Sequence, residues 1–371
     1  MYLKNIRQNS SFALLSAVSI ILILSITFFE YGFNNTILFF IGILLGITFI
    51  STSFGFSSGW TVFFRDLDSS SILKQFMLIG LTSLFILPTV HFFESYNPTI
   101  APISISLLIG SFIFGIGMQL SNGCASGTLF SVGSSNTKMM IVLVFFVIGS
   151  FVGSLILPSA INIGSIKPIL IGGDFNFIKK ILLNTSILLG IAFIFYKVSR
   201  KKIIINFKDI IAIIIISVLC LMCLLFSGYT WGITFGLTVW GGKLWSLAGG
   251  DIYSFTFWNW TRPAQALESS LLSEVSSLMN IGMILGSLTY VVITKRIILS
   301  YNFNLKIISA SIIGGLLMGI GARLAFGCNI GAFLGGISSG SLHGWVWFLF
   351  ALFGGWIGFK LRNYLNLNNA L

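Results

Sequence analysis

Ten stretches of about 20 mostly apolar residues divide this chain almost from end to end. They lie at 11–29, 34–50, 74–93, 103–123, 138–157, 181–198, 209–228, 274–294, 307–327 and 342–361. A helix of about 20 apolar residues is long enough to cross the hydrocarbon core of a bilayer. Only 8% of the residues are charged and 56% are hydrophobic, whereas about a quarter of a soluble domain is charged. The sequence therefore predicts an all-α polytopic membrane protein.

Basic residues are distributed unevenly between the alternate connections. With the N-terminus inside, fifteen Lys and Arg fall in cytoplasmic segments and five in outer segments. Because basic residues concentrate on the cytoplasmic side of membrane proteins, we expect both termini to be cytoplasmic. The net charge of +12 then reflects anchoring to the inner leaflet. It needs no nucleic-acid partner, although it favours an anionic cargo.

A glycine-cysteine segment occurs twice. Residues 110–127 read GSFIFGIGMQLSNGCASG and residues 314–331 read GGLLMGIGARLAFGCNIG, with eight identities at a constant offset of 204. A weaker echo, GITF, occurs at 46–49 and 232–235. Spans one to five therefore align with spans six to ten. Because five is odd, the second copy crosses the bilayer in the opposite direction, which predicts an inverted 5+5 repeat with membrane repeats at 1–200 and 201–371.

The stretches that follow each cysteine are unusually polar for a membrane segment. Residues 124–137 and 328–341 are rich in Gly, Ser and Asn, and residues 51–59 and 241–250 are similar. Non-helical backbone is tolerated at membrane depth only where protein or water satisfies it. We therefore expect short re-entrant segments around a central path. Close packing of helices through small residues explains many of the glycines, but it does not explain a cysteine at the same point in both copies.

The cysteines and one arginine are the chemically distinctive residues of this path. Arg323 lies within a span without an acidic residue, which is costly in lipid and marks a pathway unless the side chain reaches the interface. Its repeat partner is Gln119. Short helices starting after each cysteine would add N–H groups that attract anions. The expected path residues are Cys124, Cys328, Arg323, Gln119, Asn122, Gly123, Ser126, Gly327 and Asn329.

Metal and cofactor chemistry have little support in the sequence. His91 and His343 are the two histidines, both are expected at the outer interface, and no carboxylate lies near the paired cysteines to complete a metal site. Cys220 and Cys223 form a CxxC spacing inside a span, where small hydrophobic side chains are the better interpretation. No dinucleotide-binding motif follows a strand. We therefore expect no metal, no cofactor and no enzymatic activity.

The chain resembles the YeeE/YedE family of bacterial inner-membrane proteins. The resemblance is carried by GIGARLAFGCNIGAFLGGISSGSLHGWVWFLFALFGGWIG, by TWGITFGLTVWGGKLWSL and by FRDL at 64–67. It is closer to the YedE branch and covers nearly the whole chain. It implies a multi-pass protein of the bacterial inner membrane that imports thiosulfate or a related sulfur-containing anion.

The resemblance also implies how the anion would move. Family members pass thiosulfate along a constricted path lined by cysteines, and Cys124 and Cys328 match two of these. A third family cysteine lies earlier in the first half, where this chain has none. Weak thiol donors suit conduction, because they bind an anion without trapping it. The family often works beside a cytoplasmic SirA/TusA-like sulfur carrier protein, which implies such a partner here.

Three other functions stay open from the residues. The cargo of a YedE-like protein can be a selenium compound. A membrane thiol oxidoreductase, for example one linked to quinone, would use the same cysteines for electron transfer. A passive channel for a small neutral molecule would leave Arg323 and the cysteines without a role.

Overall fold

The computed structural model describes residues 2–173, 176–295 and 304–367, with side chains from residue 13 onward. Within these residues, ten helices have 17 or more residues, and they coincide with the ten apolar stretches. They are α1 (Tyr2–Ile26), α2 (Gly32–Thr52), α4 (Ser70–Phe92), α5 (Ile105–Ser121), α7 (Thr137–Ile163), α8 (Phe177–Val198), α9 (Phe207–Ser227), α12 (Val275–Ile293), α13 (Leu305–Leu324) and α14 (Leu342–Tyr364).

The long helices are apolar enough to make this a multi-pass membrane protein. Nine helical segments in the described parts of the chain satisfy the length and hydropathy of a membrane span, and the first, Ala13–Asp66, contains both α1 and α2. The strands β1 (Ile103–Ser104) and β2 (Ser165–Ile166) pair antiparallel, with Ile103 opposite Ile166. The all-α polytopic fold expected from the sequence is confirmed.

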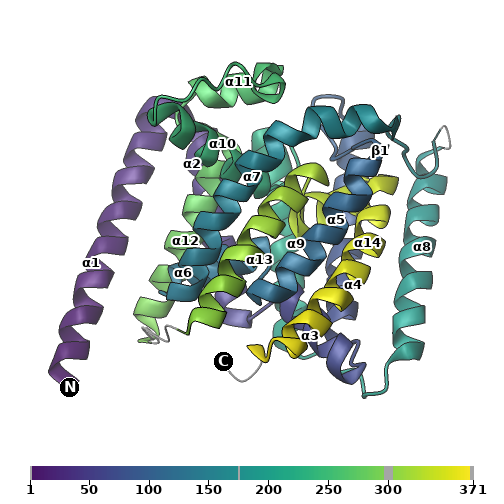
Figure 1. Ribbon diagram of the computed structural model, residues 1–371, viewed down its shortest axis with the longest axis horizontal. Helices are drawn as coiled ribbons and strands as arrows, with labels where there is room; N and C mark the ends of the chain where they lie inside the picture. Colours follow the sequence, from purple (N-terminus) through teal and green to yellow (C-terminus); the bar gives the residue numbers. More distant parts are fainter. Residues whose placement is uncertain (1, 174–175, 296–303, 368–371) are drawn as a thin grey trace.

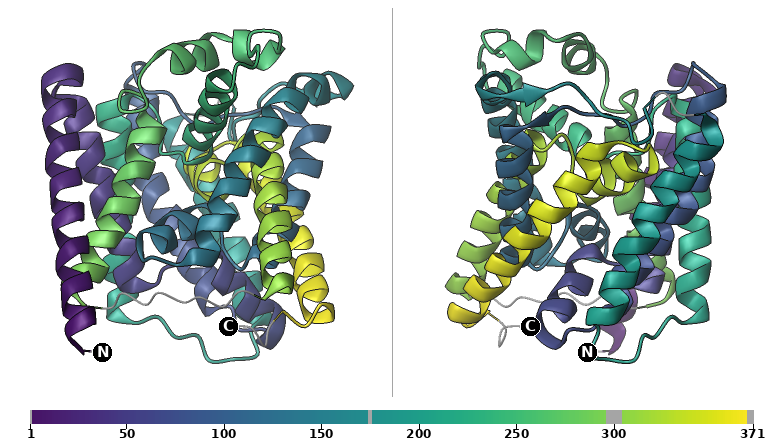
Figure 2. Two further views of the ribbon diagram at one scale, coloured as in Figure 1. Left: turned by 60° about the vertical axis from the view of Figure 1, so that its left-hand side comes forward. Right: turned by 90° about the vertical axis from the view of Figure 1, so that its right-hand side faces the viewer.

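Short helices occupy the polar stretches between the long ones. They are α3 (Phe56–Asp66), α6 (Ala125–Gly133), α10 (Thr234–Leu247), α11 (Thr261–Glu268), the π-helices η1 (Thr27–Tyr31) and η3 (Asn329–Gly336), and the 3-10 helix η2 (Thr256–Asn259). α6 follows Cys124 and η3 follows Cys328, as expected. The segment containing α11 covers the end of the molecule opposite both termini (Figures 1 and 2). That the short helices re-enter a bilayer stays a prediction.

The long helices pack in a two-fold pattern. When α1, α2, α4, α5 and α7 are matched in order with α8, α9, α12, α13 and α14, the main contacts occur in equivalent pairs. α5 on α14 corresponds to α13 on α7, α2 on α12 to α9 on α4, and α1 on α12 to α8 on α4. The matched helices α1 and α8 lie on opposite sides of the molecule (Figure 1). A duplication requires this pattern. The opposite orientation of the two copies in the bilayer and the boundary at residue 200 stay predictions.

Two matched helices, α5 and α13, pack against each other at the centre. The Ser106 hydroxyl donates to the Leu324 carbonyl at 3.1 Å, so the beginning of α5 lies beside the end of α13. Ser121, at the end of α5, lies beside Gly314 in the middle of α13. The two helices therefore run antiparallel, and the two cysteine segments leave them in opposite directions.

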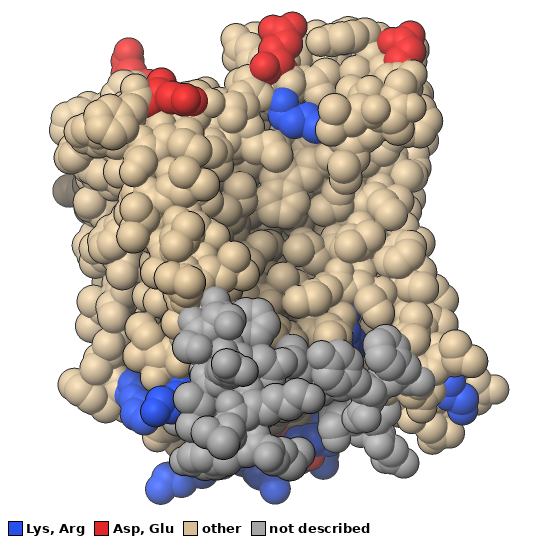
Figure 3. All heavy atoms as spheres, turned by 90° about the vertical axis from the view of Figure 1, so that its left-hand side faces the viewer, with Lys and Arg blue, Asp and Glu red and all other residues tan. Residues whose placement is uncertain are grey.

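Charged side chains are segregated between the two ends. On the face drawn in Figure 3, most Lys and Arg lie at the end that carries both termini, and most Asp and Glu lie at the other end. This distribution agrees with termini on the cytoplasmic side, which stays a prediction. We call the end with the termini the inner end and the end with α11 the outer end.

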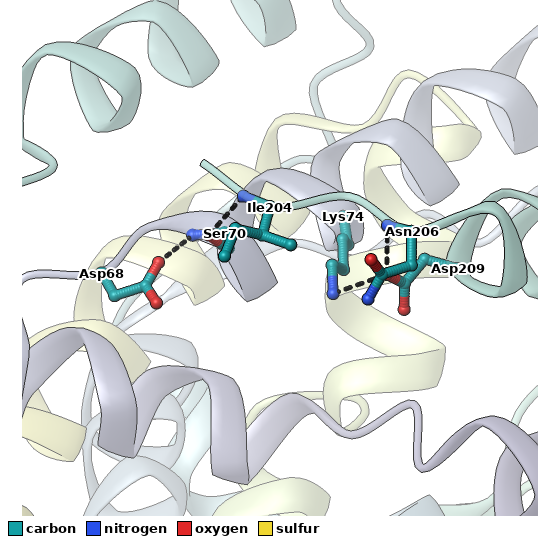
Figure 4. Close-up of polar contacts among 6 residues, drawn as sticks. All are labelled: Asp68, Ser70, Lys74, Ile204, Asn206 and Asp209. Carbon is teal, nitrogen blue, oxygen red and sulfur yellow. Dashed lines mark hydrogen bonds and ion pairs between the residues drawn. The ribbon is translucent and has the colours of Figure 1, made fainter. Parts of the chain in front are cut away.

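The connection between α8 and α9 is fastened at the inner end (Figure 4). Lys74 Nζ lies 2.8 Å from Asp209 Oδ2, which also accepts a hydrogen bond from the Asn206 backbone amide. The Ile204 amide donates to the Ser70 hydroxyl at 3.1 Å. These contacts tie the segment before α9 to the first turns of α4.

Candidate functional site

A cavity of about 360 Å³ lies at the outer end, among α10, the end of α13 and the η2–α11 segment. This volume is within the usual range for small-molecule sites. Its wall includes aromatic rings from Trp231, Phe235, Phe257 and Trp260. It also includes two arginines, which give it the electrostatic character of an anion site.

Arg323 enters the cavity from the last turn of α13. Gly153 of α7 leaves room for its stem, because a Cβ at position 153 would lie 2.9 Å from Arg323 Cβ. The guanidinium lies 5.3 Å from the ring centroid of Phe257, a cation–π contact. Its Nε is buried and has no acceptor among the described residues. Arg323 as a whole is half-buried, and its place in a transport path rather than at the interface stays a prediction.

Arg262 brings a second positive charge to the same cavity. Its guanidinium lies 4.6 Å from the ring centroids of both Tyr229 and Phe235, and it is close enough to Arg323 for the two charges to repel. Neither arginine pairs with a carboxylate in the described parts of the chain, where the ion pairs are Arg65–Asp66 and Lys74–Asp209. Two adjacent cations without a counter-ion favour an anionic ligand.

Three buried donors around the cavity lack acceptors. Besides Arg323 Nε, these are Trp231 Nε1 and the Thr234 hydroxyl, and all three residues line the cavity. Buried polar groups in proteins almost always have a hydrogen-bond partner, so an exception points to an absent ligand, ion or water. Indole and guanidinium nitrogens donate only. The missing partner must therefore offer acceptor atoms, as an oxyanion does.

Cys328 lies directly beneath this cavity. Gly327 and Gly331 both line the cavity, whereas the cysteine between them is wholly buried. The Thr234 hydroxyl and the amides of Ile330 and Gly331 surround its sulfur, although Thr234 makes no hydrogen bond of acceptable geometry. That an anion leaving the cavity inward meets this thiol stays a prediction.

Cys124 occupies the equivalent place before α6. Its sulfur accepts a hydrogen bond from the Gly127 amide at 3.2 Å and lies 3.4 Å from the Ser126 hydroxyl. It is about 1% exposed and close enough to Cys328 for the two to interact electrostatically. Neither cysteine forms a disulfide. Both cysteines are thus buried in the same apolar core, where α6 and η3 contact each other, and neither faces lipid.

Two other expected residues lie around this pair. Asn329 is wholly buried, and its Nδ2 lies 3.7 Å from Met118 Sδ, while its Oδ1 has no donor among the described residues. The Gly123 amide donates to the Met118 carbonyl at 3.2 Å. Both contacts involve α5, so the two glycine-cysteine segments share this helix as a support.

Gln119 and Asn122 lie away from the outer cavity. The Thr61 hydroxyl donates to Gln119 Oε1 at 2.8 Å, and Asn122 Oδ1 accepts from Arg362. Gln119 holds the repeat position of Arg323, yet the antiparallel packing of α5 and α13 places the two at different ends. The outer cavity therefore contains Arg323, whereas Gln119 lies toward the inner end.

Some groups of the outer site were not predicted from the sequence. Trp231 and Thr234 were absent from the expected path, although Thr234 belongs to the repeated GITF segment, which was the available signal. The expectation of an interfacial His343 is wrong, because the side chain is wholly buried and bonds to the Ser341 hydroxyl at 2.7 Å. Gly336 of η3 leaves room for this ring, because a Cβ at position 336 would lie 2.7 Å from His343 Cε1. Cys220 and Cys223 are buried in the apolar core.

Comparison with known proteins gives one family and three relatives. The family model described as "Sulphur transport" matches residues 51–357. The probable transporter YedE of Escherichia coli (strain K12) is 33% identical over 132 residues, which is 36% of this chain and 32% of YedE. The probable transporter YedE of Salmonella typhimurium is 31% identical over the same shares. The aligned part thus spans about a third of the length of these two relatives.

A third relative aligns over more of the chain. The thiosulfate transporter TsuA of Spirochaeta thermophila is 27% identical over 274 residues, which is 67% of this chain and 75% of TsuA. The alignment with TsuA is longer but less similar than the alignments with YedE.

Proposed function

This chain belongs to the Sulphur transport family, the YeeE/YedE family expected from its sequence, and we propose that it imports thiosulfate or a related sulfur-containing anion. The unpartnered donors of the outer cavity carry this proposal. Arg323 Nε, Trp231 Nε1 and the Thr234 hydroxyl are all buried without acceptors. The oxygens of a sulfur oxyanion supply acceptors to all three, and Arg262 adds charge.

The cysteines are proposed as the next step of the path. Thiosulfate carries a terminal sulfur that is large and polarisable, so a thiol can contact it through weak S–H donation. A fixed cationic pocket would hold the dianion too tightly, whereas conduction requires binding that is weak enough to release. Cys328 lies beneath the cavity, and Cys124 lies close to it. The anion moves from the arginines to Cys328 and then to Cys124.

Both thiols are protonated in this proposal. A thiolate would repel an arriving dianion and would be expensive to hold in a buried position. Both sulfurs are at most 1% exposed, so packed neighbours must move aside before an anion reaches them. The closed state in the structure therefore keeps the path from leaking other ions.

Import follows from the proposed orientation. The basic residues of Figure 3 gather at the end with the termini, which supports a cytoplasmic position for that end. The outer cavity then opens toward the periplasm, where an external sulfur source arrives. A cytoplasmic sulfur carrier protein would receive the anion at the opposite end.

Uptake of labelled thiosulfate by proteoliposomes containing the purified protein tests this function. We expect saturable uptake by the wild type, and loss of most uptake in Cys124→Ala and Cys328→Ala. Cys220→Ala is the matched control, because Cys220 is also a buried cysteine but lies in α9, and it should transport normally. Wild-type vesicles that accumulate no more thiosulfate than empty vesicles would reject the proposal. Normal uptake by both cysteine variants would remove the thiols from the path.

A further inference from the structure

A second group of buried cations lies at the inner end, beside the first glycine-cysteine segment. Arg362, near the end of α14, is about 2% exposed. Its Nη1 donates to Asn122 Oδ1 at 2.5 Å and lies 3.5 Å from the Gln119 carbonyl. Asn122 precedes Cys124 by two residues, so the positive charge of Arg362 lies beside the first glycine-cysteine segment.

Lys138 is the second cation of this group. It lies in the first turn of α7 and is half-buried. The next residue, Met139, packs on Gly123, where an added Cβ would lie 3.1 Å from its sulfur. Lys138 is thereby placed against the same segment as Arg362.

No carboxylate among the described residues neutralises this pair. The ion pairs found there, Arg65–Asp66 and Lys74–Asp209, involve neither residue. The partners of Arg362 are a neutral amide oxygen and a neutral carbonyl. Burying two like charges together costs free energy unless an opposite charge joins them. An oxyanion between Lys138 and Arg362 supplies that charge.

The inner group resembles the outer site in arrangement. At the outer end, two adjacent cations lie beside Gly327 and Cys328. At the inner end, Arg362 contacts Asn122, and Lys138 precedes Met139, which packs on Gly123. A second cavity, of about 440 Å³, lies at the inner end between Leu120 of α5, Lys306 of α13 and the residues that follow α14. It lies next to the sequence neighbours of Gln119 and Arg362.

We propose that Lys138, Arg362 and Asn122 form an inner oxyanion site that receives thiosulfate from Cys124 before its release. Asn122 fixes the guanidinium, and Arg362 and Lys138 supply the charge. The anion is thus attracted to both ends of the cysteine pair, and repulsion between successive anions promotes release. This site rests on the proposed transport of an oxyanion.

Equilibrium binding of labelled thiosulfate to the purified protein in nanodiscs, which expose both ends, tests this site without requiring transport. The wild type should bind two thiosulfate ions. Lys138→Gln should weaken one of them about tenfold, as expected for loss of one charge-assisted hydrogen bond. Arg262→Gln should weaken the other ion instead.

Two further variants serve as controls for this test. Lys360→Gln is the matched control, because Lys360 lies on α14 near Arg362 but is exposed over the Trp356 ring, and its titration should equal that of the wild type. Arg362→Lys is the second variant, because it keeps the positive charge at this position. The Arg362→Lys protein should still bind two thiosulfate ions.

The possible results separate the inner site from the transport function. A Lys138→Gln titration identical to that of the wild type, or a wild type that binds a single ion, overturns the inner site. Two ions with the expected losses in the variants support it. Absence of uptake by wild-type proteoliposomes would reject transport, and the binding result would still decide the inner site.

Discussion

Gly117 of α5 and Gly314 of α13 lie against each other's backbone. A Cβ on Gly117 would be 2.7 Å from the Gly314 carbonyl oxygen, and a Cβ on Gly314 would be 2.9 Å from that of Gly117. Exchange of the two repeats converts this contact into a contact between Gly321 and Gly110, which is also present at 2.6 to 2.8 Å. The repeated glycines thus bring the two cysteine-bearing helices into backbone contact.

We predict that Gly117→Ala destabilises the protein. The added methyl group has no space between the two backbones, and overpacking of this kind costs about 1–3 kcal/mol. Gly190→Ala is the control, because a Cβ at position 190 of α8 meets no atom within 4 Å, and there alanine should be neutral or slightly stabilising. Thermal unfolding in detergent, followed by circular dichroism, measures both. Equal melting temperatures for the two variants would contradict the close contact.

The indole nitrogen of Trp231 should contribute to anion affinity. Trp231→Phe removes the unpartnered N–H but keeps a large ring, which in the wild type lies 6.0 Å from the ring of Phe49. We expect affinity for thiosulfate to fall by at least about tenfold, because one hydrogen bond to a charged group contributes about 1.5–3 kcal/mol. Trp258→Phe also removes a buried, unpartnered indole N–H, but from a residue that does not line the cavity, and affinity should not change. Similar effects of both substitutions would show that the loss is structural.

Arg323→Gln should weaken thiosulfate binding more at low salt than at high salt. The substitution removes one of the two positive charges of the cavity. Salt screens the attraction between that charge and the anion, so its loss matters less at high salt. Titrations at about 20 mM and 500 mM sodium chloride measure the difference between wild type and variant. Arg65→Gln is a suitable control, because Arg65 is exposed and pairs with Asp66 away from the cavity. An affinity of Arg323→Gln equal to that of the wild type would remove Arg323 from the site.

Cys328 and Cys124 should react slowly with a membrane-impermeant thiol reagent. Both are at most 1% exposed, and reaction requires the packed neighbours to move. We expect a reagent added at the outer end to modify Cys328 before Cys124, because Cys328 lies beneath the outer cavity. Mass spectrometry of variants that retain one of these two cysteines, with Cys220 and Cys223 replaced, measures the rates. Faster modification of Cys124 from the outer side would reverse the proposed order of the path.

The ion pair between Lys74 and Asp209 should contribute more to stability than the pair between Arg65 and Asp66. The first is largely buried, with side-chain exposures of 16% and 14%, and Asp209 also accepts the Asn206 amide (Figure 4). Asp209→Asn should cost about 1–2 kcal/mol. Asp66→Asn removes an exposed pair and should change stability by less than about 0.5 kcal/mol. Chemical denaturation in detergent compares the two, and a larger effect of Asp66→Asn would contradict the expectation.

Much of the fold could be read from local sequence. Apolar stretches of about 20 residues can satisfy their backbone in lipid only as helices, and for this reason the ten long helices appear where hydropathy places them. The polar Gly- and Ser-rich residues after Cys124 and Cys328 could not extend these helices, and α6 and η3 begin there. The doubled motif predicted two related halves, and the equivalent contacts of α5 with α14 and of α13 with α7 agree with that expectation.

The composition of the sites depends on long-range packing. Arg323 meets Trp231 and Arg262 through the packing of three separate elements, and Lys138 meets Arg362 across more than 220 positions of sequence. Gln119, the repeat partner of Arg323, lies at the other end because α5 and α13 run antiparallel. Hydropathy and spacing are local properties and report which segments enter the membrane. Which side chains share a cavity depends on how closely the helices approach one another. Between α5 and α13, backbone contact at the paired glycines sets that distance.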